Sequence, residues 1–329
     1  MSVSGNMKTS LAFRALRRIS GIPGQLARTR PLDLASFPAS TILVAGSGRS
    51  GTTWLAEILL ANRPARYIFE PFHPIRSKES GSLGGRRYIP PQTRDSVLEA
   101  RLESILRGGI HNPWVNRLNR RVICRRRLIK CIRANLMLRW IHRLHPHLKI
   151  IYIIRHPMAM ANSYTELHMR PPMEEYLRQP DLVTDYMKGM EKQFREPGTP
   201  FAAHLLRWAL EQAVALDGLV TSEGLHILFY EHLCVHPGIE LKRLGDFLGR
   251  SPDQAMFRAL NRPSSMSHAG SAIRTGTDRV QRWRSNVSPE QERFADRLLS
   301  RLGLDALYGK DGMPVSPPGT PPEPYRFPG

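Results

Sequence analysis

Cysteine is scarce in this chain, with three residues among 329: Cys124, Cys131 and Cys234. Their spacing matches neither a metal-binding nor a redox motif, and it does not form a disulfide framework. Cys234 lies between His232 and His236, but this isolated triplet is a weak basis for a zinc site. We therefore expect reduced thiols, as in a cytoplasmic protein.

Long apolar runs are missing as well. No stretch approaches the ~20 residues that a helix needs to cross a bilayer. Residues 1–40 hold six Lys or Arg against one acid and lack the long apolar core of a secretory signal. We predict a basic leader that is disordered, forms a transit peptide, or lies on a membrane surface through a short helix at residues 7–19. The expected location is the cytoplasm, with peripheral attachment at the inner membrane surface as the alternative.

Acidic residues are the third shortage. The chain has 28 Asp and Glu against 48 Lys and Arg, which gives a net charge of +20. Residues 101–155 alone carry fourteen Lys or Arg and one acid, Glu103. Such a field concentrates anionic ligands or holds a protein near an anionic surface, although basic residues that merely solvate helix faces would look the same. No nucleic-acid reading motif or interleaved aromatics occur in this stretch, so no specific nucleic-acid partner is expected. The oligomeric state is not indicated.

From residue 41 onward, short apolar runs alternate with helical patterns. This alternation predicts one α/β domain over residues 41–305, a P-loop-type parallel sheet of about five strands flanked by helices. The predicted strands are 41–46, 66–70, 127–132, 149–154 and 225–230. The predicted helices are 51–62, 95–107, 135–145, 157–168, 200–222, 238–249 and 288–302. Prolines among mixed charges predict an irregular insertion at 171–200, and seven prolines predict a disordered tail at 311–329.

The most informative stretch is residues 41–54, TILVAGSGRSGTTW. An apolar strand runs into a glycine-rich turn and then into the start of a helix. Converging backbone N–H groups and the positive end of a helix bind phosphate oxygens. Gly46 and Gly51 have the spacing of a P-loop, G-x-x-x-x-G-K-[ST], but Thr52 stands at the lysine position. The loop's cation is Arg49.

The end of this stretch, GRSGTTW at 48–54, resembles the phosphosulfate-binding loop of the sulfotransferases, which in many cytosolic members is similar to P-K-S-G-T-T-W. The arginine variant is closer to the carbohydrate-modifying and bacterial branches. The resemblance implies transfer of a sulfuryl group from 3′-phosphoadenosine 5′-phosphosulfate (PAPS) to a hydroxyl. It implies that Arg49 stabilises the charge of the leaving 3′,5′-bisphosphate. The implied donor-binding residues of the loop are Arg49, Ser50, Gly51, Thr52, Thr53 and Trp54.

A second segment, KIIYIIRHPMAMANSY at 149–164, resembles the element of this family that grips the donor's 3′-phosphate. A buried strand ends in Arg155, and Ser163 follows eight residues later on the next helix. Arginine offers a bidentate fork to a phosphate, and serine adds a further donor. The resemblance therefore implies that Arg155 and Ser163 bind the 3′-phosphate.

A third segment, SAIRTGTDRVQRWRS at 271–285, resembles the family's arginine- and glycine-containing loop that closes over the same phosphate. It departs from the compact Arg-Lys-Gly form, so Arg274, Arg279 and Arg282 compete for the role. We favour Arg274 together with Gly276. A mobile basic surface loop is the alternative.

The acceptor hydroxyl needs a general base close to the sulfur, usually a histidine or a carboxylate. In the cytosolic branch a histidine follows a strand similar to Ile-Lys-Thr-His. Here the corresponding strand reaches Lys130 and continues with Cys131 and Ile132, so that histidine is absent. Lys130 is expected to contribute a further cation at the reacting group.

The candidate bases lie in the segment YIFEPFH at 67–73. It resembles the Glu-Pro segment of carbohydrate-type sulfotransferases, where a glutamate can be the base. Glu70 is therefore the favoured base and His73 the alternative. A third reading is that Glu70 only pairs with an arginine of the phosphate loop.

Two other classes of function stay open. A P-loop kinase or NTPase would need the Walker lysine and a magnesium-binding carboxylate, and the sequence shows neither, so no metal is implied. A non-catalytic basic anion-binding module would leave the coupled Arg49 and Arg155 segments unexplained. The sequence does not name the acceptor; an anionic saccharide, a glycolipid or a small alcohol would each suit the basic surface, and we favour a saccharide or glycolipid.

Overall fold

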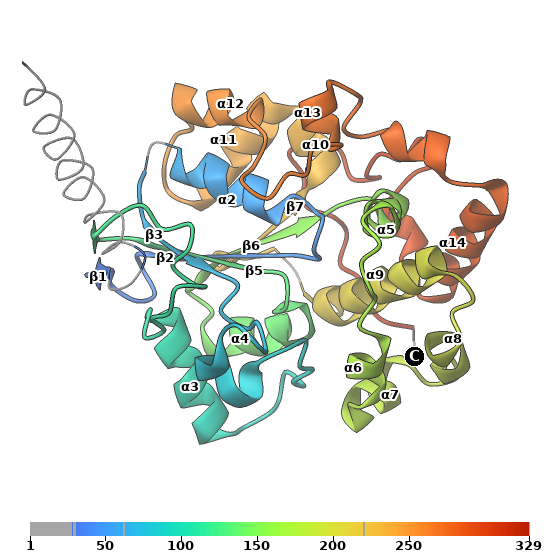
Figure 1. Cartoon of the computed structure of the whole chain (residues 1–329), viewed down its shortest axis with the longest axis horizontal. Helices are drawn as coiled ribbons and strands as arrows, with labels where there is room; N and C mark the ends of the chain where they lie inside the picture. Colours follow the sequence, from blue (N-terminus) through green and yellow to red (C-terminus); the bar gives the residue numbers. More distant parts are fainter. Residues whose placement is uncertain (1–27, 29–30, 62, 220, 329) are drawn as a thin grey trace, which may run out of the picture.

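A computed structural model describes residue 28 and residues 31–61, 63–219 and 221–328 (Figure 1). The helix considered at residues 7–19 lies outside the described residues. Within the described part of the chain, five strands form one parallel sheet in the order β3-β5-β2-β6-β7. The strands are β2 (Thr41–Ala45), β3 (Arg66–Phe69), β5 (Arg127–Cys131), β6 (Lys149–Ile154) and β7 (Leu225–Phe229). The predicted parallel sheet and its strands are therefore confirmed.

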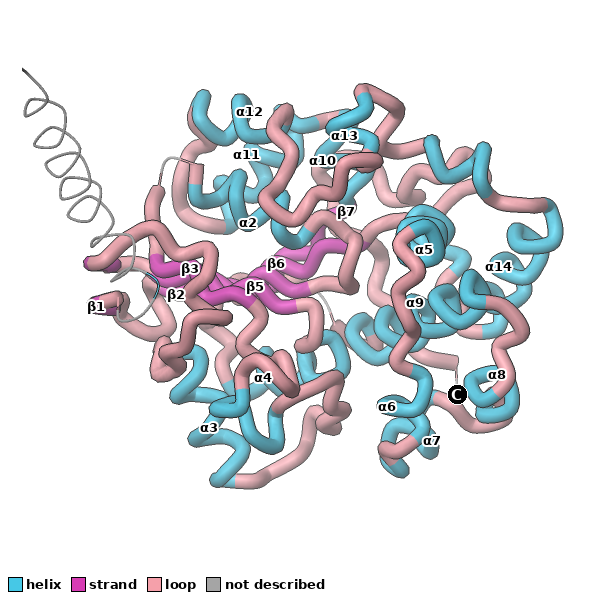
Figure 2. The backbone as a smooth tube through the Cα atoms, viewed as in Figure 1, coloured by secondary structure: helices cyan, strands magenta, loops and turns pink. Residues whose placement is uncertain are grey.

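Helices cover both faces of this sheet, which is why its strands are apolar on both sides (Figure 1, Figure 2). In β2, Val44 faces one core, while Leu43 and Ala45 face the other. The first core lies under α2 (Thr52–Leu60), α10 (Tyr230–Val235), α11 (Pro237–Phe247) and α12 (Gln254–Leu260). The second lies under α3 (Ser96–Leu106), α4 (Leu138–Leu144), α5 (Pro157–Glu166), α9 (Pro200–Leu216) and α14 (Pro289–Arg301).

Local capping signals explain where several helices begin. The side chains of Asp95 and Thr199 accept hydrogen bonds from the first turns of α3 and α9. Ser288 and Gln291 form a reciprocal capping box at the start of α14. No helix in the described part of the chain is both long and apolar enough to cross a membrane.

The segment 171–200 is more regular than its composition predicts. All of it is described, and it forms α6 (Met173–Leu177), α7 (Pro180–Tyr186) and α8 (Glu191–Arg195). Pro180 occupies the first turn of α7, where a missing N–H costs nothing. Tyr176 and Phe194 are buried. The expectation of an irregular insertion is thus wrong, because its apolar side chains find a core that the sequence pattern does not reveal.

The fold begins before the predicted boundary at residue 41. Strand β1 (Leu32–Asp33) pairs with β4 (Ile123–Cys124). The Asp33 carboxylate accepts hydrogen bonds from Arg66 at 3.1 Å and from Arg127 at 2.8 Å. Residues 32–33 are therefore tied to the edge of the main sheet and are not part of a loose leader.

The proline-rich end of the chain also packs against the domain. Tyr325 is buried, and its hydroxyl donates to the carbonyl of Leu302 at 2.6 Å. The Phe327 N–H donates to Asp217 at 3.2 Å, and the Phe327 ring lies 4.8 Å from that of Tyr186. The prolines favour an extended path, but the two aromatic rings attach it. The prediction of a disordered tail is corrected accordingly.

Candidate active site

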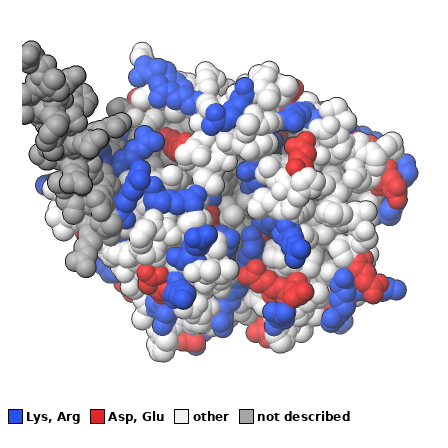
Figure 3. Space-filling view, in the orientation of Figure 1, with Lys and Arg blue, Asp and Glu red and all other residues white. Residues whose placement is uncertain are grey.

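The three motif segments meet at one cavity of about 450 Å³. It lies beyond the carboxyl ends of the parallel strands, the edge at which ligands bind in open α/β sheets. The phosphate loop after β2, helix α5 and the 264–283 segment all contribute to its walls. On the face drawn in Figure 3, Lys and Arg side chains gather around the hollowed centre.

The sharp turn of the phosphate loop requires glycine at two positions, because neighbouring atoms leave no room there for a side chain. A Cβ at Gly46 would overlap the carbonyl oxygen of Ile153, and Gly51 has φ 90° with the Tyr230 ring beside it. Helix α2 then starts at Thr52 without a side-chain cap. No capping side chain among the described residues therefore occupies its first N–H groups, which offer the anion-binding end of a helix. Thr52, Thr53 and Trp54 line the cavity, whereas Ser50 is not part of the lining and is buried, with a hydroxyl that has no partner among the described residues.

Arg49 connects the phosphate loop to the second motif. Its backbone has φ 69°, and its Nε donates to the Ser163 hydroxyl at 3.1 Å. Its carbonyl accepts from Arg155 Nη1 at 3.0 Å. Burial lowers the pKa of Arg49; Tyr164 raises it and Arg155 lowers it further. Segments more than 100 residues apart in sequence thus place three polar side chains on one wall.

Neighbouring residues hold the Arg155 side chain in place but do not use all of its hydrogen-bond donors. Its guanidinium lies 4.5 Å from the Tyr230 ring centroid, and Nη2 donates to the Arg279 carbonyl at 3.3 Å. Its Nε is buried without a partner among the described residues. Neutral carbonyls are weak partners for a guanidinium, so this side chain is suited to an incoming anion. Ser163 lines the same cavity.

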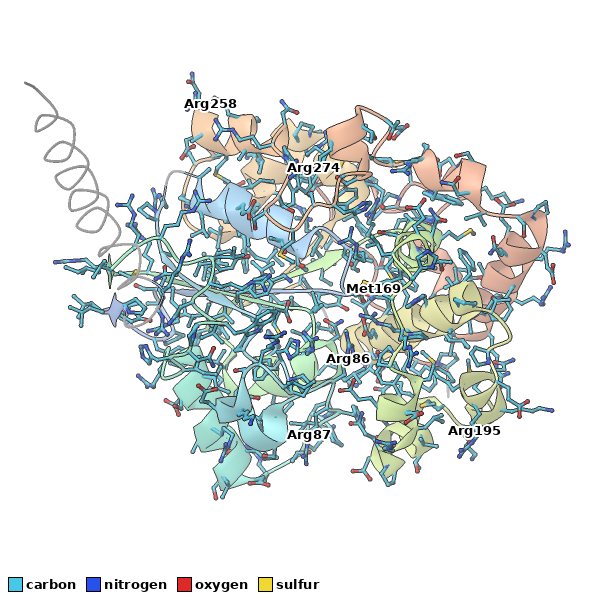
Figure 4. All side chains as sticks on the ribbon, in the orientation of Figure 1. Arg86, Arg87, Met169, Arg195, Arg258 and Arg274 are labelled. Atoms are coloured by element: carbon cyan, nitrogen blue, oxygen red, sulfur yellow. The ribbon has the colours of Figure 1, made fainter. Side chains whose placement is uncertain are left out.

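The third motif contributes different residues from those favoured by the sequence. Arg279 and Arg282 line the cavity, and Arg274 and Gly276 do not. Arg274 is exposed on the short helix α13 (Ala272–Thr275) (Figure 4). The Arg279 guanidinium lies 5.5 Å from the Trp54 ring centroid and donates to the Leu260 carbonyl at 3.0 Å.

Glu70 lies at the end of β3 and lines the cavity, yet it is only 2% exposed. Lys130 Nζ lies 2.6 Å from its Oε1, and Arg133 Nη1 lies 2.8 Å from its Oε2. The Ile132 N–H also donates to Oε1 at 3.2 Å. Burial raises the pKa of Glu70, but Lys130 and Arg133 lower it more, so it lies below its usual value. The carboxylate is therefore ionised at neutral pH, and its partners are not arginines of the phosphate loop.

His73 also lines the cavity, but its ring is less suited to accept a proton. Its Nδ1 accepts from the backbone N–H groups of Ile75 and Arg76, both at 3.3 Å. Because backbone amides can only donate, Nδ1 is unprotonated and the proton of the neutral ring is on Nε2. Burial lowers the pKa of His73, and Arg133 lowers it further.

The residues that line the cavity but were not predicted from sequence include Arg133, Trp114 and Arg117. Arg133 follows Lys130 by three residues at the carboxyl end of β5. The rule that ligands bind at this edge of a parallel sheet would have been a signal for it. Trp114 and Arg117 lie in a loop before β4, where no local pattern indicates a site.

Beneath the phosphate loop lies a buried polar cluster around Glu211 of α9. Ser47 donates to its carboxylate at 2.5 Å, Tyr176 at 2.8 Å and Arg207 at 3.0 Å. Arg86 lies 3.3 Å away. Burial raises the pKa of Glu211, but Arg207 and Arg86 lower it to about 2.

Comparison with known proteins places this arrangement in a family. The sulfotransferase family matches residues 41–254 of the chain, which include the phosphate loop, Glu70, Lys130, Arg155 and Ser163. A comparison with curated proteins finds no match.

Solved structures similar to this chain include two sulfotransferase domains. The sulfotransferase domain of the curacin biosynthetic pathway is 17% identical, covering 80% of this chain and 96% of that one, with a TM-score of 0.45. The corresponding domain of the Synechococcus PCC 7002 olefin synthase is 18% identical, covering 82% and 95%, with a TM-score of 0.43. A mouse sulfotransferase, SULT7A1, complexed with PAP is 18% identical, covering 84% and 87%, with a TM-score of 0.38. By the family match over residues 41–254, this chain is an enzyme of the sulfotransferase family.

Proposed function

We propose that this chain transfers the sulfuryl group of PAPS to an acceptor hydroxyl bound in the 450 Å³ cavity. The observation that carries the proposal is the contact between Arg49 of the phosphate loop and Ser163 of α5. It brings the two candidate phosphate-binding segments together on the cavity that Glu70 and Lys130 also line. A kinase reading has no such support, since Thr52 replaces the Walker lysine.

The donor is held at both of its phosphate groups. The first amides of α2 and the Arg49 side chain receive the 5′-phosphosulfate, and Arg155 with Ser163 receives the 3′-phosphate. Arg279 and Arg282 supply further positive charge at the cavity wall, the role for which Arg274 was favoured from sequence.

The transfer forms one bond and breaks one bond. The acceptor oxygen attacks the sulfur in line, and the bond from sulfur to the bridging phosphate oxygen breaks. The negative charge that builds on the leaving 3′,5′-bisphosphate is stabilised by Arg49 and the loop amides. Glu70, ionised and facing the cavity, takes the acceptor's proton, while Lys130 holds Glu70 and adds positive charge beside the reacting group.

The acceptor belongs to the saccharide or glycolipid class. These molecules carry the hydroxyl that the reaction needs, and the cavity combines aromatic and cationic walls. Trp114 provides an aromatic edge near His73, with ring centroids 4.9 Å apart, and Arg133 and Arg117 provide charge.

A thermal-shift comparison of 3′,5′-bisphosphate (PAP), ADP and ATP, with and without magnesium, tests the donor. PAP is expected to raise the melting temperature most, without magnesium. Arg155→Ala is expected to weaken PAP binding by about 2–5 kcal/mol, as for a lost buried charge contact, with little effect on ADP. Equal losses for PAP and ADP would remove Arg155 from the 3′-phosphate site, and a preference for ATP with magnesium would favour a kinase or NTPase.

Transfer itself is measured with sulfur-labelled PAPS and extracts of the native host. The labelled product, once identified, names the acceptor. If the Glu70→Gln variant forms little or none of this labelled product, the reaction takes place in this cavity. Absence of any labelled product in the presence of saturating PAPS would contradict the proposed transfer.

A further inference from the structure

A second hollow, of about 710 Å³, lies between α2 and α12 and is here called the arginine groove. Four of its lining residues are arginines, Arg120, Arg121, Arg258 and Arg262, and all four are exposed. None of them forms an ion pair with a carboxylate in the part of the chain that the structure describes. Four unpaired cations around one hollow attract an anion with several charges.

The interior of the arginine groove adds little opposing charge. Among the described residues that line it, the acid is Glu57, and this carboxylate already accepts from the Ser265 hydroxyl at 2.5 Å and the Ser265 N–H at 3.1 Å. Tyr67 also lines the groove and is 3% exposed, and its hydroxyl has no hydrogen-bond partner in the part of the chain that the structure describes. The groove therefore keeps a positive excess and an unused polar group.

The arginine groove and the active-site cavity share a wall. Trp54 lines both. In the segment 262–268, Arg262, Pro263 and Ser265 line the groove, whereas Ser264, Met266, Ser267 and His268 line the cavity. A chain-like ligand that leaves the cavity over this wall enters the groove directly.

A further unpaired cation stands at the cavity side of this wall. The Arg117 guanidinium lies 4.1 Å from the Trp114 ring centroid and 4.2 Å from that of Phe69. It also donates to the Met266 sulfur at 2.9 Å. No carboxylate among the described residues pairs with it. Its sequence neighbour Leu118 lines the groove, so Arg117 stands at the boundary between the cavity and the groove.

We propose that the arginine groove binds the distal units of an acidic glycan whose reacting hydroxyl lies at Glu70. The inference rests on the proposed sulfuryl transfer and specifies its acceptor as a chain that repeats hydroxyl and carboxylate or sulfate groups. Repeated charges match the unpaired arginines, and the hydroxyl supplies the reacting oxygen. A nucleic acid fits less well, because Trp54 and Tyr67 of the groove are buried and present no stacking surface for bases.

Charge reversal tests the groove with a matched control. The groove variant is Arg258→Glu with Arg262→Glu. The control is Lys192→Glu with Arg195→Glu, which makes the same change in net charge at exposed positions of α8. Figure 4 shows Arg258 and Arg195 at opposite ends of the molecule.

The probes are an unsulfated decasaccharide of alternating glucuronic acid and N-acetylglucosamine, and the corresponding disaccharide. Binding to the PAP-loaded protein is measured by calorimetry. Wild type and control should bind the decasaccharide more tightly than the disaccharide. The groove variant should bind the decasaccharide roughly tenfold more weakly, as for lost exposed charge contacts, with unchanged disaccharide binding.

Three results would overturn the inference. One is a wild-type protein that binds both saccharides equally or neither. Another is an equal loss in the α8 control, which would reflect net charge alone. The third is tighter binding of single-stranded DNA or phosphatidylserine vesicles than of the decasaccharide through the same arginines.

Thermal shift with PAP separates this inference from the proposed function. A groove variant that keeps the wild-type melting-temperature shift with PAP and binds the decasaccharide as tightly as wild type would refute the groove inference and leave the donor proposal intact. A wild-type protein without any PAP shift would refute the donor proposal, while decasaccharide binding, then measured in the absence of PAP, would still decide the groove.

Discussion

Glu70 and Glu211 form the centres of two buried ionic clusters that resemble each other in their electrostatics. Each carboxylate is paired with two cations, Lys130 and Arg133 in one cluster, Arg207 and Arg86 in the other. In both, burial raises the carboxyl pKa and the cations lower it below its usual value.

The two clusters differ in what they face. Glu70 and both of its cations line the active-site cavity, and Glu211 does not. Glu211 instead binds Ser47 of the phosphate loop and Tyr176 of α6. A perturbed pKa therefore identifies both carboxylates as unusual, but only access to the cavity distinguishes a candidate base from a support for the loop.

The largest effect is expected for Glu211→Gln, which tests whether the Glu211 cluster contributes more to the stability of the fold than the Glu70 cluster does. Arg207 and Arg86 would then be buried without a counter-charge, so the free energy of unfolding should fall by about 3–5 kcal/mol. Urea denaturation measures it. Glu70→Gln should cost less, since water in the open cavity can solvate Lys130 and Arg133; an equal loss in the two variants would contradict the distinction.

The next largest effect is expected for Glu70→Gln on the turnover rate, and it tests whether Glu70 takes part in the reaction. Glu70→Gln keeps the shape of the side chain and removes its basicity, so turnover should fall ~10²-fold or more with PAP binding retained. Initial rates with labelled PAPS and a thermal shift with PAP measure the two quantities. His73→Ala should leave most of the turnover. Near wild-type transfer in the glutamine variant, with transfer abolished by His73→Ala, would make His73 the base.

The phosphate loop contacts the Glu211 cluster through Ser47 and lines the active-site cavity with Arg49, so substitutions of these two residues should have different effects. Arg49→Ala should lower turnover at saturating donor by roughly tenfold or more, because it removes charge from the leaving group. Arg49→Lys should keep part of the activity. Ser47→Ala should instead lower the free energy of unfolding by about 1–2 kcal/mol through the lost bond to Glu211. Full turnover of Arg49→Ala at saturating PAPS would refute the assignment.

Acid titration should show the Glu211 cluster without a mutation. The pKa of Glu211 is about 2 in the folded chain against an ordinary value of 4.5. Its contribution to stability is therefore complete above pH 4.5 and is lost as the pH falls towards about 2. At about pH 4 the loss should be on the order of 1 kcal/mol. Denaturation of wild type and Glu211→Gln across this range should show a smaller slope in the variant.

The smallest effect is expected for Arg274, one of the three arginines at 274–282 that could bind the donor. Arg274 does not line the cavity, whereas Arg279 and Arg282 do. Arg274→Ala should change PAP affinity by less than about 0.5 kcal/mol, as for an exposed side chain outside the cavity lining. Arg279→Ala should weaken PAP binding more. Calorimetry with PAP compares the two; a larger loss for Arg274→Ala would restore the preference drawn from sequence.

Much of the donor side could be predicted from sequence because its signals are local. Gly46, Gly51 and the start of α2 are neighbours along the chain, and strand, turn and helix follow from their order alone. Arg155 follows the end of β6, and Ser163 lies about two helical turns later on α5. Their spacing is therefore visible as a sequence pattern. The parallel sheet was predictable for the same reason, since its strands are continuous apolar runs.

Other features were decided only in three dimensions. The partners of Glu70 come from a strand some 60 residues away, and Glu211 reaches Ser47 across 164 residues. The choice of Arg279 over Arg274 depends on which way a loop faces, and the burial of Tyr325 depends on a surface built by distant helices. The sequence by itself determined the five strands of the main sheet, most of the helices that flank it and the phosphate loop, because these follow from neighbouring residues. Only the tertiary structure decided which charges pair and which face the cavity, because pairing depends on distances that chain order does not encode.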